Sequence, residues 1–141
     1  GLSAHTDSTA QSPSLKANLA TDIMLQPMLA PILKLPVTLY RLGVWKMAGV
    51  KPADILISPI MGDLSGLPPT LLQVSASEML YDDNLRYAVK AQKAGSDVRV
   101  QSWRDMCHVW HIFDDKLAES HAAFDEIAAF LQAQGVGPNA A

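Results

Sequence analysis

Two short apolar segments separated by a helical pattern constrain the fold of this chain more than any other feature. Residues 70–75 have the length and apolar character of a buried strand, and residues 97–103 alternate as a half-exposed strand does. The stretch 84–94 between them has one apolar helical face and is followed by Gly95 as a C-cap. This order predicts a right-handed parallel β–α–β unit.

Two parallel strands form an incomplete sheet, because a parallel sheet needs both faces covered and further neighbouring strands. A second amphipathic helix is predicted over residues 120–134, where Phe124, Ile127, Ala128 and Leu131 share one face. We therefore expect an α/β fold in which these 141 residues form the terminal part of a larger domain.

The composition excludes several classes of protein. A net charge of -3 gives no electrostatic reason to bind nucleic acid or an anionic membrane, and one cysteine permits no intrachain disulfide. The apolar stretch 23–50 is interrupted by prolines and by basic residues, so we expect no membrane span there. No basic segment followed by an apolar run begins the chain, so we expect no signal peptide and a cytoplasmic location.

The first half of the chain is predicted to be loops and short helices. Residues 1–13 and 51–69 are rich in turn-forming residues, and the prolines within 14–48 favour several short helices over a long one. The many leucines and methionines of 14–48 allow two interpretations, ordinary core or a lid that lines an acyl pocket. The pattern alone favours core.

The candidate catalytic residues follow the two predicted strands. The carboxyl ends of parallel strands meet at one edge of a sheet, so an acid after 70–75 and His108 after 97–103 can converge there. A carboxylate in that position orients the imidazole of a general base. Glu78, Asp82 and Asp83 compete for the acid's role. Since Asp82 and Asp83 also suit an N-cap and first helical turn, we favour Glu78, with Asp82 as the alternative.

Three other patterns in the sequence are weaker indications of a functional site. His108 and His111, with acids beyond, could hold zinc, but the spacing is common by chance, so we expect no metal and no cofactor, and a packing role for His111. Cys107 is expected to be buried and inert. Residues 1–5 superficially resemble a nucleophile elbow, but they lack its closing glycine and its flanking strand and helix. No Gly-x-Ser-x-Gly sequence supplies a nucleophile for His108.

Taken in order, these segments resemble the C-terminal part of bacterial hormone-sensitive-lipase-like esterases, which have an α/β-hydrolase fold. Three segments between residues 58 and 131 carry the resemblance: Ser58-Pro59 with 63–69 and the following strand, 78–83, and 106–113. Residues 3–7 resemble more weakly the family's Ser-Pro-Trp-Thr-Asp, with Ala4 and His5 as departures. Ser77 stands where close relatives often have a further aspartate.

The resemblance implies a carboxylesterase that hydrolyses short-chain acyl esters through a Ser–Glu–His triad. His108 matches the catalytic histidine, and Glu78 matches a position that is often aspartate. The family's Gly-Asp-Ser-Ala-Gly nucleophile and His-Gly-Gly oxyanion loop both belong upstream of this chain. A catalytically incomplete fragment with a binding or structural role remains the alternative.

The resemblance also implies a domain organisation and a set of partners. Residues 1–17 would be a loop after a truncated upstream strand, 18–50 part of a helical cap, and 51–141 the C-terminal part of the core. This favours the lid interpretation, with Met24, Met28, Leu29 and Val109 in a substrate pocket. The implied partners are a small acyl ester, the upstream half of the enzyme, and a second copy paired along the strand 97–103.

Overall fold

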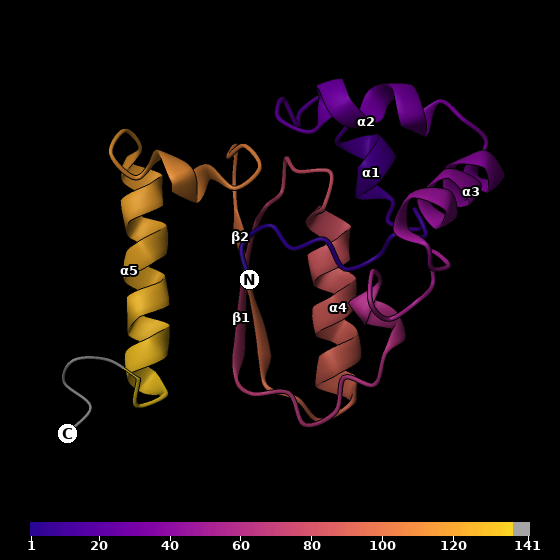
Figure 1. The fold of residues 1–141 in the computed structure, drawn as a ribbon. Helices are drawn as coiled ribbons and strands as arrows, with labels where there is room; N and C mark the ends of the chain where they lie inside the picture. The colour runs from indigo at the N-terminus through magenta and orange to yellow at the C-terminus, as the bar shows by residue number, and fades with distance from the viewer. Residues whose placement is uncertain (137–141) are drawn as a thin grey trace.

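The computed structural model describes residues 1–136 and has the predicted parallel β–α–β unit at its centre (Figure 1). Strand β1 (Thr70–Ser75) pairs in parallel with β2 (Val98–Trp103), in a register that runs from Thr70 opposite Val98 to Ser75 opposite Trp103. Helix α4 (Tyr81–Lys93) connects them. The apolar β1 segment is buried at five of its six residues, as its sequence predicts.

Residues 1–3 extend the sheet on the other side of β1. Leu2 forms a parallel bridge with Gln73, whose N–H donates to the Gly1 carbonyl at 2.9 Å and whose carbonyl accepts from the Ser3 N–H at 2.8 Å. The prediction of a loop over residues 1–13 therefore holds except at Leu2, which forms this isolated bridge. A single bridge is too short to produce a periodic pattern in the sequence.

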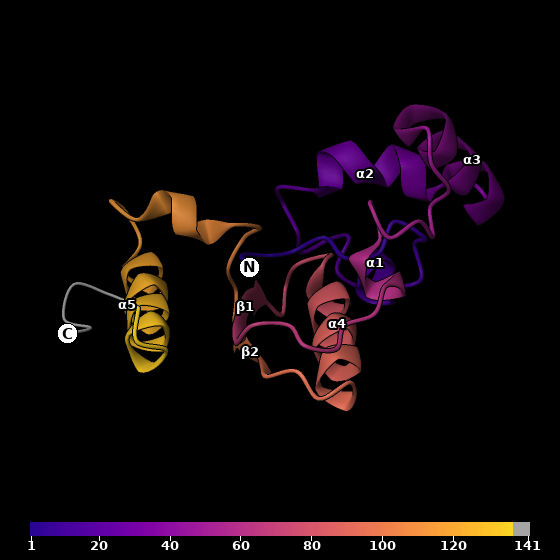
Figure 2. The same cartoon turned by 60° about the horizontal axis from the view of Figure 1, so that its bottom comes forward.

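Two helices cover opposite faces of the strands, as Figures 1 and 2 both show. Helix α4 packs on one face, where it forms an apolar cluster of Leu64, Leu72, Ala88, Ala91 and Val98. Helix α5 (Ala118–Ala133) lies on the other face. There Gln73 Nε2 donates to the Ala123 carbonyl at 3.0 Å, so a polar side chain of the central strand joins sheet and helix.

The helix boundaries differ from the sequence predictions at their N-terminal ends. Helix α5 begins two residues before the predicted 120, and α4 begins at Tyr81 rather than 84. Asp82 and Asp83 therefore lie in the first turn of α4, with Leu80 at the N-cap position. Their carboxylates accept hydrogen bonds from another segment of the chain and do not cap α4. Gly95 follows the helix with φ of 86°, as predicted.

Residues 14–48 form short helices, as their prolines predict. The three helices are α1 (Ser14–Ala17), α2 (Gln26–Leu33) and α3 (Val37–Ala48). A short 3₁₀ turn, η1 (Pro59–Met61), follows them. Pro36 occupies the N-cap position of α3. A second 3₁₀ turn, η2 (Trp110–Phe113), precedes α5.

Most apolar side chains of α2 and α3 are exposed, so the interpretation of 14–48 as ordinary core is wrong for this chain. Leu25, Leu29 and Leu33 pack against a small buried cluster. Met28, Leu39, Trp45 and Met47 are 49–91% exposed. Figure 2 shows that α2 and α3 lie apart from the two strands.

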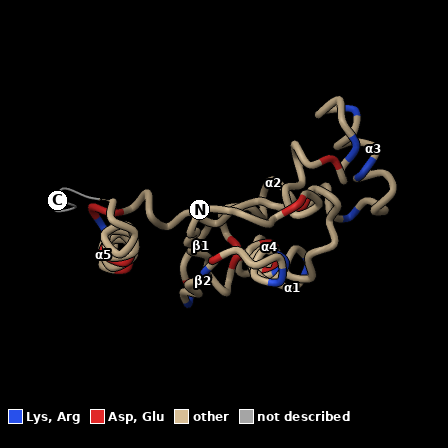
Figure 3. The backbone as a smooth tube through the Cα atoms, turned by 90° about the horizontal axis from the view of Figure 1, so that it is seen from below, with Lys and Arg blue, Asp and Glu red and all other residues tan. Residues whose placement is uncertain are grey.

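The charged residues are divided among the helices. Figure 3 shows basic residues on α3 and acidic residues on α5, with both signs on α4. Among residues 1–136, no helix combines the length and the apolar character needed to cross a bilayer.

Candidate active site

Glu78 and His108 meet at the carboxyl ends of the two strands. Glu78 lies in the turn after β1 and is fully buried, whereas His108 lies in the loop after β2 with its side chain 20% exposed. The two atoms His108 Nδ1 and Glu78 Oε2 are 2.9 Å apart. Because Nδ1 faces the carboxylate, we assign the Nδ1–H tautomer to His108, which leaves Nε2 as the nitrogen able to take up a proton.

The orientation of the Glu78 carboxylate is fixed by its second oxygen. Oε1 accepts hydrogen bonds from the Ser75 N–H at 2.7 Å and from the Ser3 hydroxyl at 2.9 Å. The backbone of the turn is also held, since Asn18 Nδ2 donates to the Glu78 carbonyl at 2.8 Å. A buried carboxylate with these partners presents Oε2 to His108 in a defined geometry.

The loop that carries His108 is anchored to β1. The Met106 N–H donates to Ser75 Oγ at 3.1 Å, and the Val109 N–H donates to Ser3 Oγ at 3.2 Å. Val109 has φ of 51°, a conformation that β-branched residues rarely adopt. Backbone strain of this kind persists where neighbouring contacts hold the segment, and it is frequent next to active sites.

The two other candidate acids do not contact His108. An oxygen of Asp82 accepts from the Ser14 N–H at 2.7 Å, at the start of α1. Asp83 is fully buried and accepts from the N–H groups of Thr6 and Asp7, each at 3.0 Å. Of the three acids, the structure brings only Glu78 to the histidine.

His111 has a packing role within the described structure. Its Nε2 lies 2.9 Å from Gln73 Oε1, and its ring lies 4.0 Å from the Trp110 ring, centroid to centroid. Burial lowers the pKa of His111, which favours the neutral imidazole. Within residues 1–136, no three His, Cys, Asp or Glu side chains are arranged to hold a metal ion.

Cys107 is half-buried, which is less than the full burial expected from the sequence. Burial raises the pKa of its thiol, as does the nearby negative charge of Glu78. The thiol is therefore protonated at neutral pH and is a poor nucleophile.

Comparison with known proteins identifies the fold family of this chain. A family model described as the alpha/beta hydrolase fold matches residues 5–112. The chain belongs to the α/β hydrolase fold family. The match spans the turn that holds Glu78 and the loop that holds His108, and it confirms the fold class inferred from the sequence.

Individual relatives of this α/β hydrolase chain are esterases and hydrolases. It is 42% identical over 94 residues to an acetyl-hydrolase of Streptomyces hygroscopicus, covering 67% of this chain and 31% of the relative. It is 30% identical over 131 residues to an esterase of Acinetobacter venetianus, covering 92% of this chain and 40% of the relative. The chain thus spans less than half the length of these relatives.

The chain is also similar to a solved structure from the family that the sequence resembles. The crystal structure of an esterase from the bacterial hormone-sensitive lipase family superposes with a TM-score of 0.77 at 33% identity, covering 94% of this chain and 42% of that one. The resemblance to hormone-sensitive-lipase-like esterases is confirmed.

The four residues predicted to line a substrate pocket of this α/β hydrolase differ in their surroundings. Met24 and Met28 are exposed, Leu29 packs against the buried Leu15, Met79 and Leu80, and Val109 follows His108. Their role in substrate binding stays a prediction.

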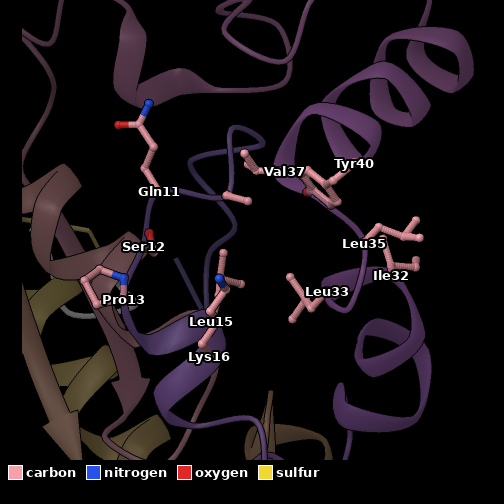
Figure 4. Close-up of a pocket in the computed structure, with 11 residues that line it drawn as sticks. Gln11, Ser12, Pro13, Leu15, Lys16, Ile32, Leu33, Leu35, Val37 and Tyr40 are labelled. Atoms are coloured by element: carbon pink, nitrogen blue, oxygen red, sulfur yellow. The ribbon is translucent and has the colours of Figure 1, made fainter.

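A separate hollow of about 230 Å³ lies between the N-terminal segment and helices α2 and α3 (Figure 4). Leu15 and Leu33 lie on opposite sides of it. Neither Glu78 nor His108 lines this hollow. Its lining consists of Ala10, Gln11, Ser12, Pro13, Leu15, Lys16, Ile32, Leu33, Leu35, Val37 and Tyr40.

Sequence reasoning missed two serines of the site. Ser75 and Ser3 are almost completely buried, and each hydroxyl accepts a hydrogen bond from the His108 loop. The only signal for Ser3 was its place at the start of the segment that resembles the family's Ser-Pro-Trp-Thr-Asp.

Proposed function

We propose that this chain is the acid–base part of a carboxylic ester hydrolase that acts on short-chain acyl esters. In this proposal His108 is the general base, Glu78 is the triad acid, and the nucleophilic serine with its oxyanion donors comes from a preceding segment. The observation that carries the proposal is the 2.9 Å contact between His108 Nδ1 and a fully buried Glu78 carboxylate.

The reaction follows from the free nitrogen of His108. The upstream serine attacks the ester carbonyl carbon while His108 Nε2 takes the hydroxyl proton. The resulting imidazolium is stabilised by Glu78 and returns the proton to the departing alcohol. Water then attacks the acyl-enzyme, with His108 again accepting and returning a proton, so that the acid is released and the serine restored.

Ser3 does not serve as the nucleophile in this proposal. Its hydroxyl donates to Glu78 Oε1 and accepts from the Val109 N–H, so it faces the acid and the backbone. A nucleophilic serine must instead donate to the free nitrogen of the histidine. The nucleophile in this proposal therefore comes from outside the present chain.

An apolar hollow beside the sheet supports an upstream partner segment. It measures about 420 Å³ and is lined by residues 1–2, by β1 and by helix α5. We propose that the preceding part of the sheet packs here and that α2 and α3 form part of a cap over the substrate. The apolar residues that line the hollow are Leu2, Pro69, Leu71, Ile127, Phe130 and Leu131, and the polar Thr70 and Gln73 also line it.

The preference for short acyl groups is supported by the relatives. The acetyl-hydrolase is named for an acetyl group, and the Acinetobacter venetianus protein is an esterase. Met24, Met28, Leu29 and Val109 remain the proposed contacts of the acyl chain, since flexible methionines adapt to ligands of varied shape.

A fluorophosphonate probe tests this function. The protein is labelled as it occurs in its source, and the intact mass of each labelled species is measured. We expect the label on a species longer than this chain or on a companion of it, and none after heat denaturation. If neither a species that contains this chain nor a companion of it is labelled, the result contradicts the proposal and favours a binding or structural role.

A further inference from the structure

We propose that Ser3 is a positioning residue that holds the acid and the base of the triad together. The inference rests on the proposed function, because it assigns Ser3 a task in the same reaction. It concerns a residue that precedes β1 and lies 75 positions from Glu78 and 106 from Val109.

A single hydroxyl joins the two catalytic turns. Ser3 Oγ donates to Glu78 Oε1 at 2.9 Å and accepts from the Val109 N–H at 3.2 Å. A serine hydroxyl has one proton and two lone pairs, so both bonds can form at once. The Glu78 contact leaves Oε2 free for His108, while the Val109 contact acts on the residue directly after His108.

Ser3 is itself held in place from both sides. Its N–H donates to the Gln73 carbonyl at 2.8 Å, which fixes it to β1. The next residue, Ala4, exchanges two hydrogen bonds with the Asn84 amide of α4, at 3.2 and 3.0 Å. Because Ser3 is only 3% exposed, solvent does not compete for its hydroxyl.

The backbone of Ser3 indicates that its position is imposed by these contacts. Its φ of 45° lies in the left-handed region, which few non-glycine residues adopt. Val109, its partner across the site, is also in that region. Two such residues joined by a hydrogen bond, beside a catalytic pair, are consistent with a site held in a strained, preorganised geometry.

Loss of the Ser3 hydroxyl is expected to reduce turnover without unfolding the site. Glu78 Oε1 keeps the Ser75 N–H, and the His108 loop keeps its bond to Ser75 Oγ, so the pair can still form in looser geometry. A displacement of about 1 Å at a reacting group can lower the rate about 100-fold. The substrate contacts are unchanged, so KM should stay near its original value.

The test compares Ser3→Ala with Ser96→Ala in the full-length enzyme. Ser96 is the matched control, since it is also a buried serine whose hydroxyl joins two loops, bonding to Leu64 and Leu67 at the opposite end of the sheet. Active sites are first counted by fluorophosphonate titration. Then kcat and KM for p-nitrophenyl acetate are measured per titrated site, which separates slower chemistry from a smaller folded fraction.

We expect Ser3→Ala to lower kcat per site by about 10- to 100-fold with KM within about twofold, and Ser96→Ala to leave both unchanged. Equal per-site kcat in the two variants would overturn the role of Ser3 while leaving the function intact. If Ser3→Ala does not fold, Ser3→Cys makes the same comparison. The cysteine side chain has about the volume of serine, but its thiol is only a weak hydrogen-bond donor. Full activity of a parallel His108→Ala variant would instead overturn the proposed function.

Discussion

The Glu78 carboxylate and the His108 imidazole lie 2.9 Å apart although 30 positions separate them in the chain. The register of the parallel strands explains this contact. Ser75 is paired with Trp103, so β1 and β2 end at the same level of the sheet. A turn of three residues then reaches Glu78 and a loop of five reaches His108. Each turn is also tied back to β1, since Ser75 N–H donates to Glu78 and Ser75 Oγ accepts from the Met106 N–H.

The buried Asp83 is expected to contribute strongly to stability. It accepts hydrogen bonds from the N–H groups of Thr6 and Asp7, and Asp83→Ala leaves both buried donors without a partner. We expect a loss of about 2–4 kcal/mol in the free energy of unfolding of the full-length enzyme. Urea unfolding followed by circular dichroism measures this loss.

Asp82→Ala is the control for that variant. Asp82 accepts one hydrogen bond, from the Ser14 N–H, at a site only partly buried. Loss of a single cap of this kind costs about 1 kcal/mol. Equal losses for the two neighbouring aspartates would show that burial of Asp83 does not have the assigned effect.

His111 should make the protein less stable on acidification. Burial holds the pKa of His111 below its ordinary value of 6.5, so the unfolded chain takes up a proton before the folded one does. Stability from this residue is therefore complete above about pH 6.5 and falls as the pH decreases toward 5. His111→Gln keeps a donor for Gln73 and removes the titrating group.

Melting temperatures of the full-length enzyme between pH 7.5 and 5 measure this effect. The wild-type midpoint should fall more steeply with acidification than that of His111→Gln, with both curves parallel above pH 7. Identical slopes throughout would mean that the burial of His111 does not disfavour its charged form.

The elements that the sequence predicted well are those with local patterns. The strand Thr70–Ser75 has its predicted bounds, and β2 differs by one residue, because apolar and alternating segments of this length have few other structures available. The start of α4 was wrong for a physical reason. Asp82 and Asp83 have the residue type of an N-cap, but their carboxylates bond to a segment some 70 positions away.

The candidate site shows the same division between local and long-range information. Glu78 was favoured by elimination, since the other two acids had an explanation within the helix. The hydrogen bonds of the Ser3 hydroxyl could not be inferred, because its partners Glu78 and Val109 lie far along the chain and no spacing relates them. The exposure of Met28 and Met47 was also unpredictable, because it depends on which surfaces other segments cover.

The free side of β2 is the proposed dimer contact. Within the described residues β2 pairs with β1 alone, and its other side presents backbone groups that a second copy could pair. We predict a dimer of the full-length enzyme by light scattering. Ser102→Lys adds a long, positively charged side chain to this exposed edge and should shift the mass toward a monomer. A wild-type monomer at micromolar concentration would contradict the contact.

The central claim is that Glu78 and His108 act together as the acid and base of ester hydrolysis. Its most direct test is kcat for p-nitrophenyl acetate in three variants of the full-length enzyme, each confirmed to be folded. We predict losses of about ten-thousand-fold or more for His108→Ala and about a thousand- to ten-thousand-fold for Glu78→Gln, with Asp82→Asn within about twofold of wild type. Near-wild-type turnover by His108→Ala, or a large loss in Asp82→Asn alone, would contradict the account.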